Sequence, residues 1–153
     1  MYKVTNVYED ASVMAPDLLA AECTRSSILA YQEYLMTLPG GFDLPVQHNI
    51  SDGVYAREAF LPKGSIVVGK IHKHGHLNII SRGKVQVLTE FGVQEMEGPL
   101  TFKSLPGTKR VVKVLEDTQW TTIHLNPTNT QDLSELEDDI IASSYEELEG
   151  EIL

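Results

Sequence analysis

The sequence has a single cysteine, Cys23, so no disulfide can form within the chain. A protein without disulfides suits a reducing compartment. No apolar run approaches the roughly 20 residues that span a bilayer. The start of the chain, MYKVTNVYED, lacks the apolar core of a signal peptide. We therefore expect a cytoplasmic protein with no membrane segment.

Several catalytic signatures are also missing. The sequence contains no P-loop, dinucleotide fingerprint, nucleophile elbow or paired-cysteine zinc motif. Basic residues are absent from residues 127–153, which carry nine acids, whereas residues 51–126 carry ten bases and seven acids, a balance of +3. Because binding to phosphate backbones needs a net basic face, the overall charge of −10 argues against a nucleic-acid partner.

At 153 residues the chain is expected to form one domain with three parts. Residues 1–50 are predicted to be a helical extension, since Ala15–Leu38 has apolar residues at helical spacing. Residues 51–126 alternate short β-branched and aromatic runs with turn signals about ten residues apart, which predicts about seven strands in an all-β barrel. Residues 127–153 predict an acidic helix, with an apolar stripe that packs on the barrel or on a partner, and a tail.

Three histidines, His72, His74 and His76, occupy alternate positions in the stretch GKIHKHGHLNIISRG. Residues two apart in a strand point to the same side, so we expect these histidines and Lys70 on one face unless Gly75 introduces a bulge. The pattern is consistent with a metal site and equally with a polar edge strand.

A second segment is expected to bring a further imidazole to this face. The stretch TKRVVKVLEDTQWTTIH predicts a hairpin with its turn at Asp117, in which Arg110 lies opposite His124. Cross-strand neighbours have Cβ atoms about 5 Å apart, so Arg110 and His124 should share a face.

Residues 51–126 resemble the cupin superfamily. The first cupin motif is matched in spacing by Gly64, Lys70, His72, His76 and Gly83, and the second by Pro106, Gly107 and Arg110. The resemblance implies a double-stranded β-helix (jelly-roll) barrel with flanking helices. Three positions depart from the family's metal ligands: Lys70 and Arg110 replace histidines, and His76 replaces a glutamate.

The stretches GVYAREAFLPKG, HKHGHLN, PGTKR and WTTIHLNP, followed by an acidic helix, also resemble small cupin-like proteins of tailed bacteriophages. This resemblance implies a phage-encoded protein of the host cytoplasm or the virion.

The residues themselves suggest a three-imidazole metal site formed by His72, His76 and His124, with His74 as the alternative ligand if the strand is bulged. Such a set suits one divalent transition metal: Fe, Mn, Ni, Cu or Zn. Glu58 is expected to add a carboxylate or to orient a ring.

Two cations at motif positions disfavour a metal, and the same pocket then becomes a site for a small anionic molecule. Its expected ligand-binding residues are Lys70, Arg110 and Arg57, together with His72 and His124. The alternative without a ligand is a solvated basic strand face formed by Lys109, Arg110 and Lys113.

Two functions from different classes follow. One is a metal-dependent enzyme that acts on a small anionic or oxygenated substrate, and the other is a non-enzymatic ligand-sequestering or virion-associated protein that uses the barrel as a scaffold. Because open sheet edges are often covered by a second subunit, we expect a homodimer or higher oligomer.

Overall fold

The structure is a computed structural model that describes residues 3–4, 6–7 and 21–152. The first residues of the predicted helix, 15–20, lie outside the described residues. The strands are β1 (Lys3–Val4), β2 (Asn6–Val7), β3 (Phe42–Asp43), β4 (Val46–Ser51), β5 (Val54–Leu61), β6 (Ser65–Val68), β7 (Ile71–His72), β8 (His76–Thr89), β9 (Gly92–Glu97), β10 (Leu100–Ser104), β11 (Val111–Leu125) and β12 (Ile141–Ala142).

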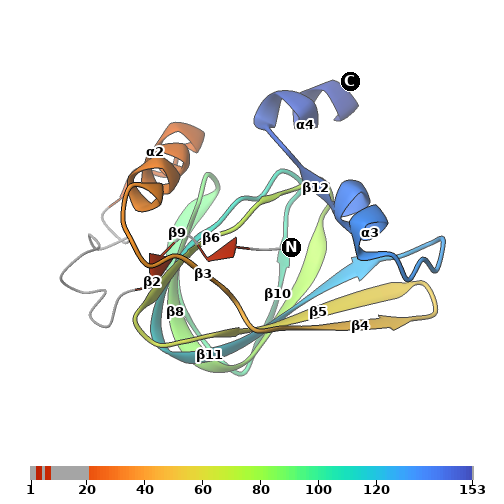
Figure 1. Cartoon of the computed structure of the whole chain (residues 1–153), viewed down its shortest axis with the longest axis horizontal. Helices are drawn as coiled ribbons and strands as arrows, with labels where there is room; N and C mark the ends of the chain where they lie inside the picture. Colours follow the sequence, from red (N-terminus) through yellow and green to blue (C-terminus); the bar gives the residue numbers. More distant parts are fainter. Residues whose placement is uncertain (1–2, 5, 8–20, 153) are drawn as a thin grey trace.

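Two long strands, β8 and β11, form the spine of an antiparallel barrel. The main sheet has the order β10-β8-β11-β5-β4, with β9 paired to β8 and β6 paired to β11. Figure 1 shows the long strands bending around the barrel, so that each serves both halves of the fold. The expected all-β jelly-roll barrel with flanking helices is confirmed.

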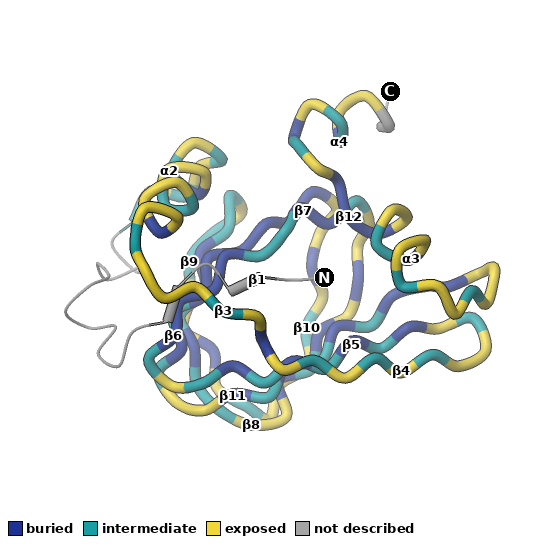
Figure 2. The backbone as a smooth tube through the Cα atoms, in the orientation of Figure 1, coloured by how far each residue is buried: buried dark blue, intermediate teal, exposed yellow. Residues whose placement is uncertain are grey.

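The core follows from the alternation of side chains along the strands. In β5 the side chains of Tyr55, Arg57, Ala59 and Leu61 are buried, whereas the residues between them are half-buried. Buried apolar residues from β5, β6, β8, β9 and β11 pack in the barrel around Trp120. In Figure 2 many residues of the barrel strands carry the colour of buried residues. The half-buried positions that alternate with the buried ones in β5 and in the second half of β11 lie on the opposite side of the sheet, as a period of two requires.

Two predicted turns prove to be bends within continuous strands. The chain continues as β8 through Arg82–Gly83 and as β11 through Glu116–Asp117, where the pairing of β8 with β11 shifts register. Gly83 has φ +104°, and a Cβ there would lie 2.5 Å from the Asp117 carbonyl oxygen. The residues that predicted turns therefore form β-bulges, at which the long strands bend around the barrel. The predicted hairpin that paired Arg110 with His124 is wrong.

Helix α2 (Arg25–Met36) begins at Thr24, whose hydroxyl accepts a hydrogen bond from the Ser27 backbone amide. Its buried side chains, Ile28 and Leu35, pack on residues of β6, β8 and β11. The predicted helical spacing is therefore confirmed over these residues.

Helix α3 (Leu133–Ile140) is amphipathic, and its apolar stripe packs on Tyr55 of the barrel. Of the two expected arrangements, packing on the barrel or on a partner, the structure shows the first. Residues 145–152, predicted to be a tail, instead form helix α4 (Tyr145–Ile152). Tyr145 and Leu148 are buried against Ile71 and Ala142, which explains why this short segment is ordered.

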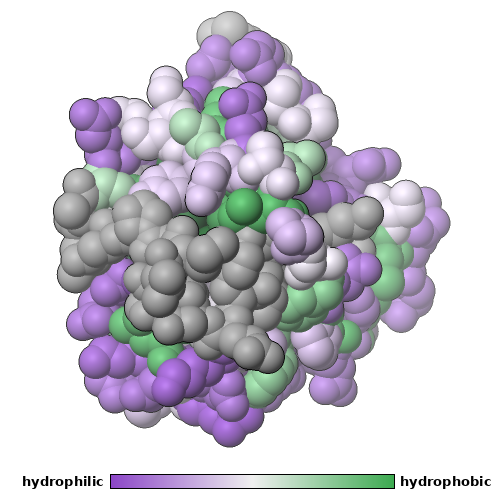
Figure 3. Space-filling view, turned by 60° about the vertical axis from the view of Figure 1, so that its left-hand side comes forward, coloured by the Kyte–Doolittle hydropathy of each residue, from purple (hydrophilic) through white to green (hydrophobic). Residues whose placement is uncertain are grey.

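In the described part of the chain, no helix is long and apolar enough to cross a membrane. Figure 3 shows one face of the molecule, on which hydrophilic residues predominate and hydrophobic residues form small separate patches. Scattered apolar patches of this kind are ordinary on folded proteins.

Candidate site in the barrel interior

Three histidines from distant parts of the chain meet inside the barrel. His72 lies in β7, His76 begins β8, and His124 lies near the end of β11. The pairing of β11 with β8 places Ile123 opposite Leu77 and so brings the two strand ends together. The ring centroids are 4.4 Å apart for His72 and His76, 4.8 Å for His76 and His124, and 5.7 Å for His72 and His124.

All three imidazoles are buried, and burial keeps them neutral. Burial lowers the pKa of His76 to about 4 and that of His124 to about 3, and it lowers the pKa of His72 well below its ordinary value. The cationic Arg110 adds to this effect for His72 and His76, and His76 adds to it for His124. Neutral imidazole is the form that binds metals.

Backbone carbonyls orient two of the rings. The Nδ1 atom of His72 lies 3.4 Å from the Thr108 oxygen, and that of His76 lies 3.3 Å from the His74 oxygen. A carbonyl only accepts, so Nδ1 carries the proton in each neutral ring and Nε2 keeps its lone pair. The Nε2 atom of His76 is buried and has no hydrogen-bond partner among the described residues. Nε2 of His124 lies 2.9 Å from the Thr122 hydroxyl oxygen.

Two arginines lie beside the histidines. Arg57 on β5 and Arg110, directly before β11, are both buried. The Arg110 guanidinium donates a 2.8 Å hydrogen bond to the Ser104 hydroxyl and stacks 5.1 Å from the Trp120 ring centroid. Among the described residues, no aspartate or glutamate is buried. The described side chains of this interior therefore combine two cationic groups with an apolar wall.

A cavity of about 60 Å³ reaches into this region. Its lining comprises apolar barrel residues together with Arg57, His72, Arg110 and Thr122. A water molecule takes up about 30 Å³ in the liquid, so the cavity has room for a group of only a few heavy atoms. The guanidinium groups that line it match a carboxylate or a similar planar anion.

The rings do not form a metal site as they stand. Of the His, Cys, Asp and Glu side chains in the described ranges, no three or more are arranged to hold a metal ion. The rings of His72 and His124 are stacked with an angle of 5° between their planes, so their faces, rather than their nitrogens, oppose each other.

Three predicted site residues lie elsewhere. Lys70 forms an ion pair with Glu137 of α3, with Nζ 2.5 Å from Oε1. His74 is exposed, and its Nε2 lies 3.1 Å from the Asp139 carbonyl oxygen. The chain bends between β7 and β8, which turns His74 away from its neighbours. The expectation of one face shared by Lys70, His72, His74 and His76 is thus wrong in part.

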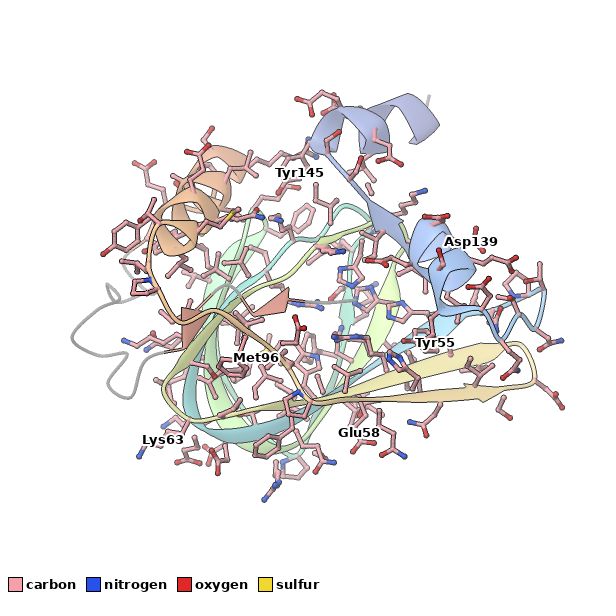
Figure 4. The ribbon with its side chains drawn as sticks, in the orientation of Figure 1. Tyr55, Glu58, Lys63, Met96, Asp139 and Tyr145 are labelled. Carbon is pink, nitrogen blue, oxygen red and sulfur yellow. The ribbon has the colours of Figure 1, made fainter. Side chains whose placement is uncertain are left out.

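Glu58 also lies away from the histidines, because it alternates with the inward residues of β5. Its carboxylate accepts a hydrogen bond from the Gln119 side chain. In Figure 4 Glu58 lies on the opposite side of the β4–β5 ribbon from Tyr55. Arg110 and Lys109, by contrast, are buried, so the expectation of a solvated face fails for these two residues.

Tyr55 and His48 extend the cluster of buried histidines, and the sequence analysis did not assign either residue to the site. The Tyr55 ring stacks on His124 with centroids 5.9 Å apart, and its hydroxyl lies 2.6 Å from Nδ1 of His48 on β4. Burial and the nearby Arg57 lower the pKa of His48. Tyr55 stands two residues before Arg57, so the alternation of β5 contained the signal for its inward direction.

No protein-family model matches the sequence, and no curated protein is similar to it. Several solved structures match part of the chain. An RmlC-like cupin family protein from Methanocaldococcus jannaschii has a TM-score of 0.47 and 12% identity, covering 56% of this chain and 83% of its own. A Cupin 2 conserved barrel domain protein from Salinispora arenicola has a TM-score of 0.47 and 13% identity, covering 61% and 85%. A putative ethanolamine utilization protein Q from Salmonella typhimurium has a TM-score of 0.47 and 7% identity, and the match covers 56% of this chain and 70% of that protein.

The resemblance to bacteriophage proteins and the expected homo-oligomer stay predictions.

Proposed function

We propose that the barrel interior binds a small anionic ligand through Arg57 and Arg110, next to a divalent transition metal held by His72, His76 and His124. The observation that carries the proposal is the meeting of three buried, neutral imidazoles and two buried guanidinium groups in one interior. Neutral imidazole is a common metal ligand, and a guanidinium group matches the geometry of a carboxylate.

The orientation of the rings supports the metal part of the proposal. A metal-binding histidine usually donates its second ring N–H to a carbonyl or carboxylate, which leaves the other nitrogen as the ligand. His72 and His76 have this arrangement, and the buried Nε2 of His76 supplies a lone pair. The stacked rings must turn before their nitrogens can converge, and rotation about χ2 of histidine is soft.

Charge links the two ligands. A divalent cation beside two guanidinium groups is disfavoured by like-charge repulsion. An anion in the cavity would offset it. We therefore expect the metal and the anion to strengthen each other's binding, with a coupling of about 1–3 kcal/mol.

The metal is tested on protein purified without a histidine tag. We expect one transition-metal ion per chain after reconstitution, measured by mass spectrometry of the metal, and loss of it in His72→Ala and His124→Ala. His74→Ala is the matched control, because His74 is exposed on the same segment and should keep the metal. Circular dichroism and Trp120 fluorescence establish that the variants fold. Full metal retention in both buried-histidine variants would contradict the assignment.

The anion is tested by calorimetric titration of formate, acetate and oxalate. Arg110→Gln should weaken binding by about 10- to 100-fold, because it removes a charged hydrogen-bond donor. Arg82→Gln, which changes an exposed arginine, should leave binding unchanged. Unaltered affinity in Arg110→Gln would rule out the anion site.

A second function is favoured by the cationic charge of Arg57 and Arg110. After burial and His76, both arginines lower the pKa of His124, so their charge reaches the cluster. In that case the barrel binds the anion alone and is a non-enzymatic ligand-sequestering module. Anion binding that is the same with and without a chelator, together with failure to take up Zn, Mn, Ni or Fe, would favour this function.

A further inference from the structure

A second hollow lies outside the barrel, between its wall and the carboxyl-terminal segment. This outer groove has a volume of about 700 Å³, within the size range of ligand sites. Its charged and phenolic lining includes Lys70, Lys73, Lys109, Glu137, Tyr145 and Glu147. It shares none of these residues with the barrel cavity.

The fold places Lys109 in the wall between the two hollows. The Gly69 amide donates to the Arg110 carbonyl and the His72 amide donates to the Thr108 carbonyl, so Lys109 is held beside β7. On the other side of β7, β12 pairs with it and forms the far wall of the groove. Arg110 lines the barrel cavity while Lys109 lines the outer groove.

Lys109 differs from the other two lysines of the groove, because it forms no ion pair with any of the described residues. Lys70 pairs with Glu137 at 2.5 Å, and Lys73 lies 3.9 Å from Glu147 and donates to the Asp138 carbonyl. Lys109 is buried, and in the described ranges its ammonium group makes no ion pair or hydrogen bond. A buried cation without compensation favours its neutral form.

The electrostatics point in the same direction. Burial, and then the charge of Lys70, lower the pKa of Lys109 to about 8. At neutral pH about one-tenth of such amines are uncharged, against about 0.03% for a lysine with the ordinary pKa near 10.5. Only the uncharged amine is a nucleophile, and desolvation beside a second cation is a known way to activate lysine.

The groove also offers hydrogen-bonding groups for a polar ligand. The Tyr145 hydroxyl is buried and has no hydrogen-bond partner among the described residues. In Figure 4 Tyr145, the first residue of α4, lies on the side of that helix toward α2, and the Arg25 guanidinium stacks 4.4 Å from its ring centroid. Three lysines face four acids in the groove, Glu137, Asp138, Glu146 and Glu147, so its charges nearly cancel and favour an uncharged ligand with hydroxyl groups.

We propose that Lys109 is a reactive amine that forms an imine with a small hydroxyaldehyde bound in the outer groove. The amine nitrogen attacks the carbonyl carbon and a C–N bond forms. Loss of the carbonyl oxygen as water, with the two amine protons, then leaves the C=N bond. No oxidant or reductant is needed for this condensation. The reaction is independent of the ligands proposed for the barrel.

The test uses glycolaldehyde with cyanoborohydride at neutral pH, which reduces each imine to a stable secondary amine. Peptide mass spectrometry then gives the extent of labelling at every lysine. We expect Lys109 to be labelled at least about tenfold faster than Lys63 and Lys103, which are exposed and serve as internal controls. Labelling of Lys109 at the rate of these lysines or below would overturn the proposal.

Two variants sharpen the result. Lys70→Met removes the neighbouring cation, so it should slow the labelling of Lys109 while the rates at Lys63 and Lys103 stay unchanged. Propanal has no hydroxyl group and should label Lys109 with less preference over the exposed lysines than glycolaldehyde does. Equal preference for both aldehydes would contradict the assigned ligand class. The wild-type measurement stands even where a variant does not fold.

Discussion

Acid should destabilise this protein through the buried histidines. His76 and His124 are neutral in the folded state because burial depresses their pKa values. In the unfolded chain the same imidazoles face water and gain protons near pH 6.5. Below that pH the unfolded state therefore binds more protons than the folded state, and the free energy of unfolding falls as the pH falls.

The size of the effect follows from the two pKa values. With folded values of about 4 and about 3, acidification from about pH 7 to about pH 5 should cost about 2 kcal/mol for each histidine, or about 4 kcal/mol together. The pKa of His72 is lowered in the same direction and adds to this loss. Small domains have only about 5–15 kcal/mol of stability, so the loss is a large share of the total.

Urea unfolding followed by the fluorescence of Trp120, the single tryptophan, measures this loss. A chelator keeps the protein metal-free, because metal binding would itself depend on pH. His124→Gln should reduce the loss by about 2 kcal/mol. The exposed-site control His74→Gln should leave it unchanged. A wild-type loss below about 1 kcal/mol would refute the reasoning that these rings are buried and neutral.

Three further changes test the fold by urea unfolding. Gly83→Ala should lower the free energy of unfolding by more than about 3 kcal/mol, because the added Cβ would meet Thr118 and Asp117. The control Gly53→Ala, with open space around it, should lower it by about 1 kcal/mol. Equal losses would contradict the argument that Gly83 is required by the bulge. Leu136→Ala should cost about 2–5 kcal/mol, and a loss under about 1 kcal/mol would mean that α3 does not dock. Thr24→Ala should cost about 1 kcal/mol by removing the cap of α2, and no loss would exclude that role.

The inward direction of His72 and His76 could be predicted only in part. A period of two placed His72, His74 and His76 on one face, and the structure separates His74 from the other two. The reason is the bend between β7 and β8, where the Lys73 amide donates to the Ile140 carbonyl of α3. That contact comes from a segment more than 60 residues away, so no local pattern contains it.

Lys70 shows the same limit for electrostatics. Its spacing matched a ligand position, yet its ammonium pairs with Glu137 outside the barrel. Whether Lys70 faces the barrel or Glu137 depends on where α3 docks, and the docking depends on burial of Leu136 and Ile140 against Tyr55. Arg57 and Arg110 were expected in one pocket and both line the barrel cavity, although the hairpin used to place Arg110 does not exist.

Local pattern was enough for the all-β class and for the amphipathic helix α3, because side-chain alternation and helical spacing are properties of neighbouring residues. Tertiary structure alone decided which of these side chains meet. The long strands bend at bulges where the sequence reads as a turn, and the carboxyl-terminal segment covers β7 and withdraws Lys70 from the barrel. Both depend on contacts between distant segments, and such contacts have no period in the sequence.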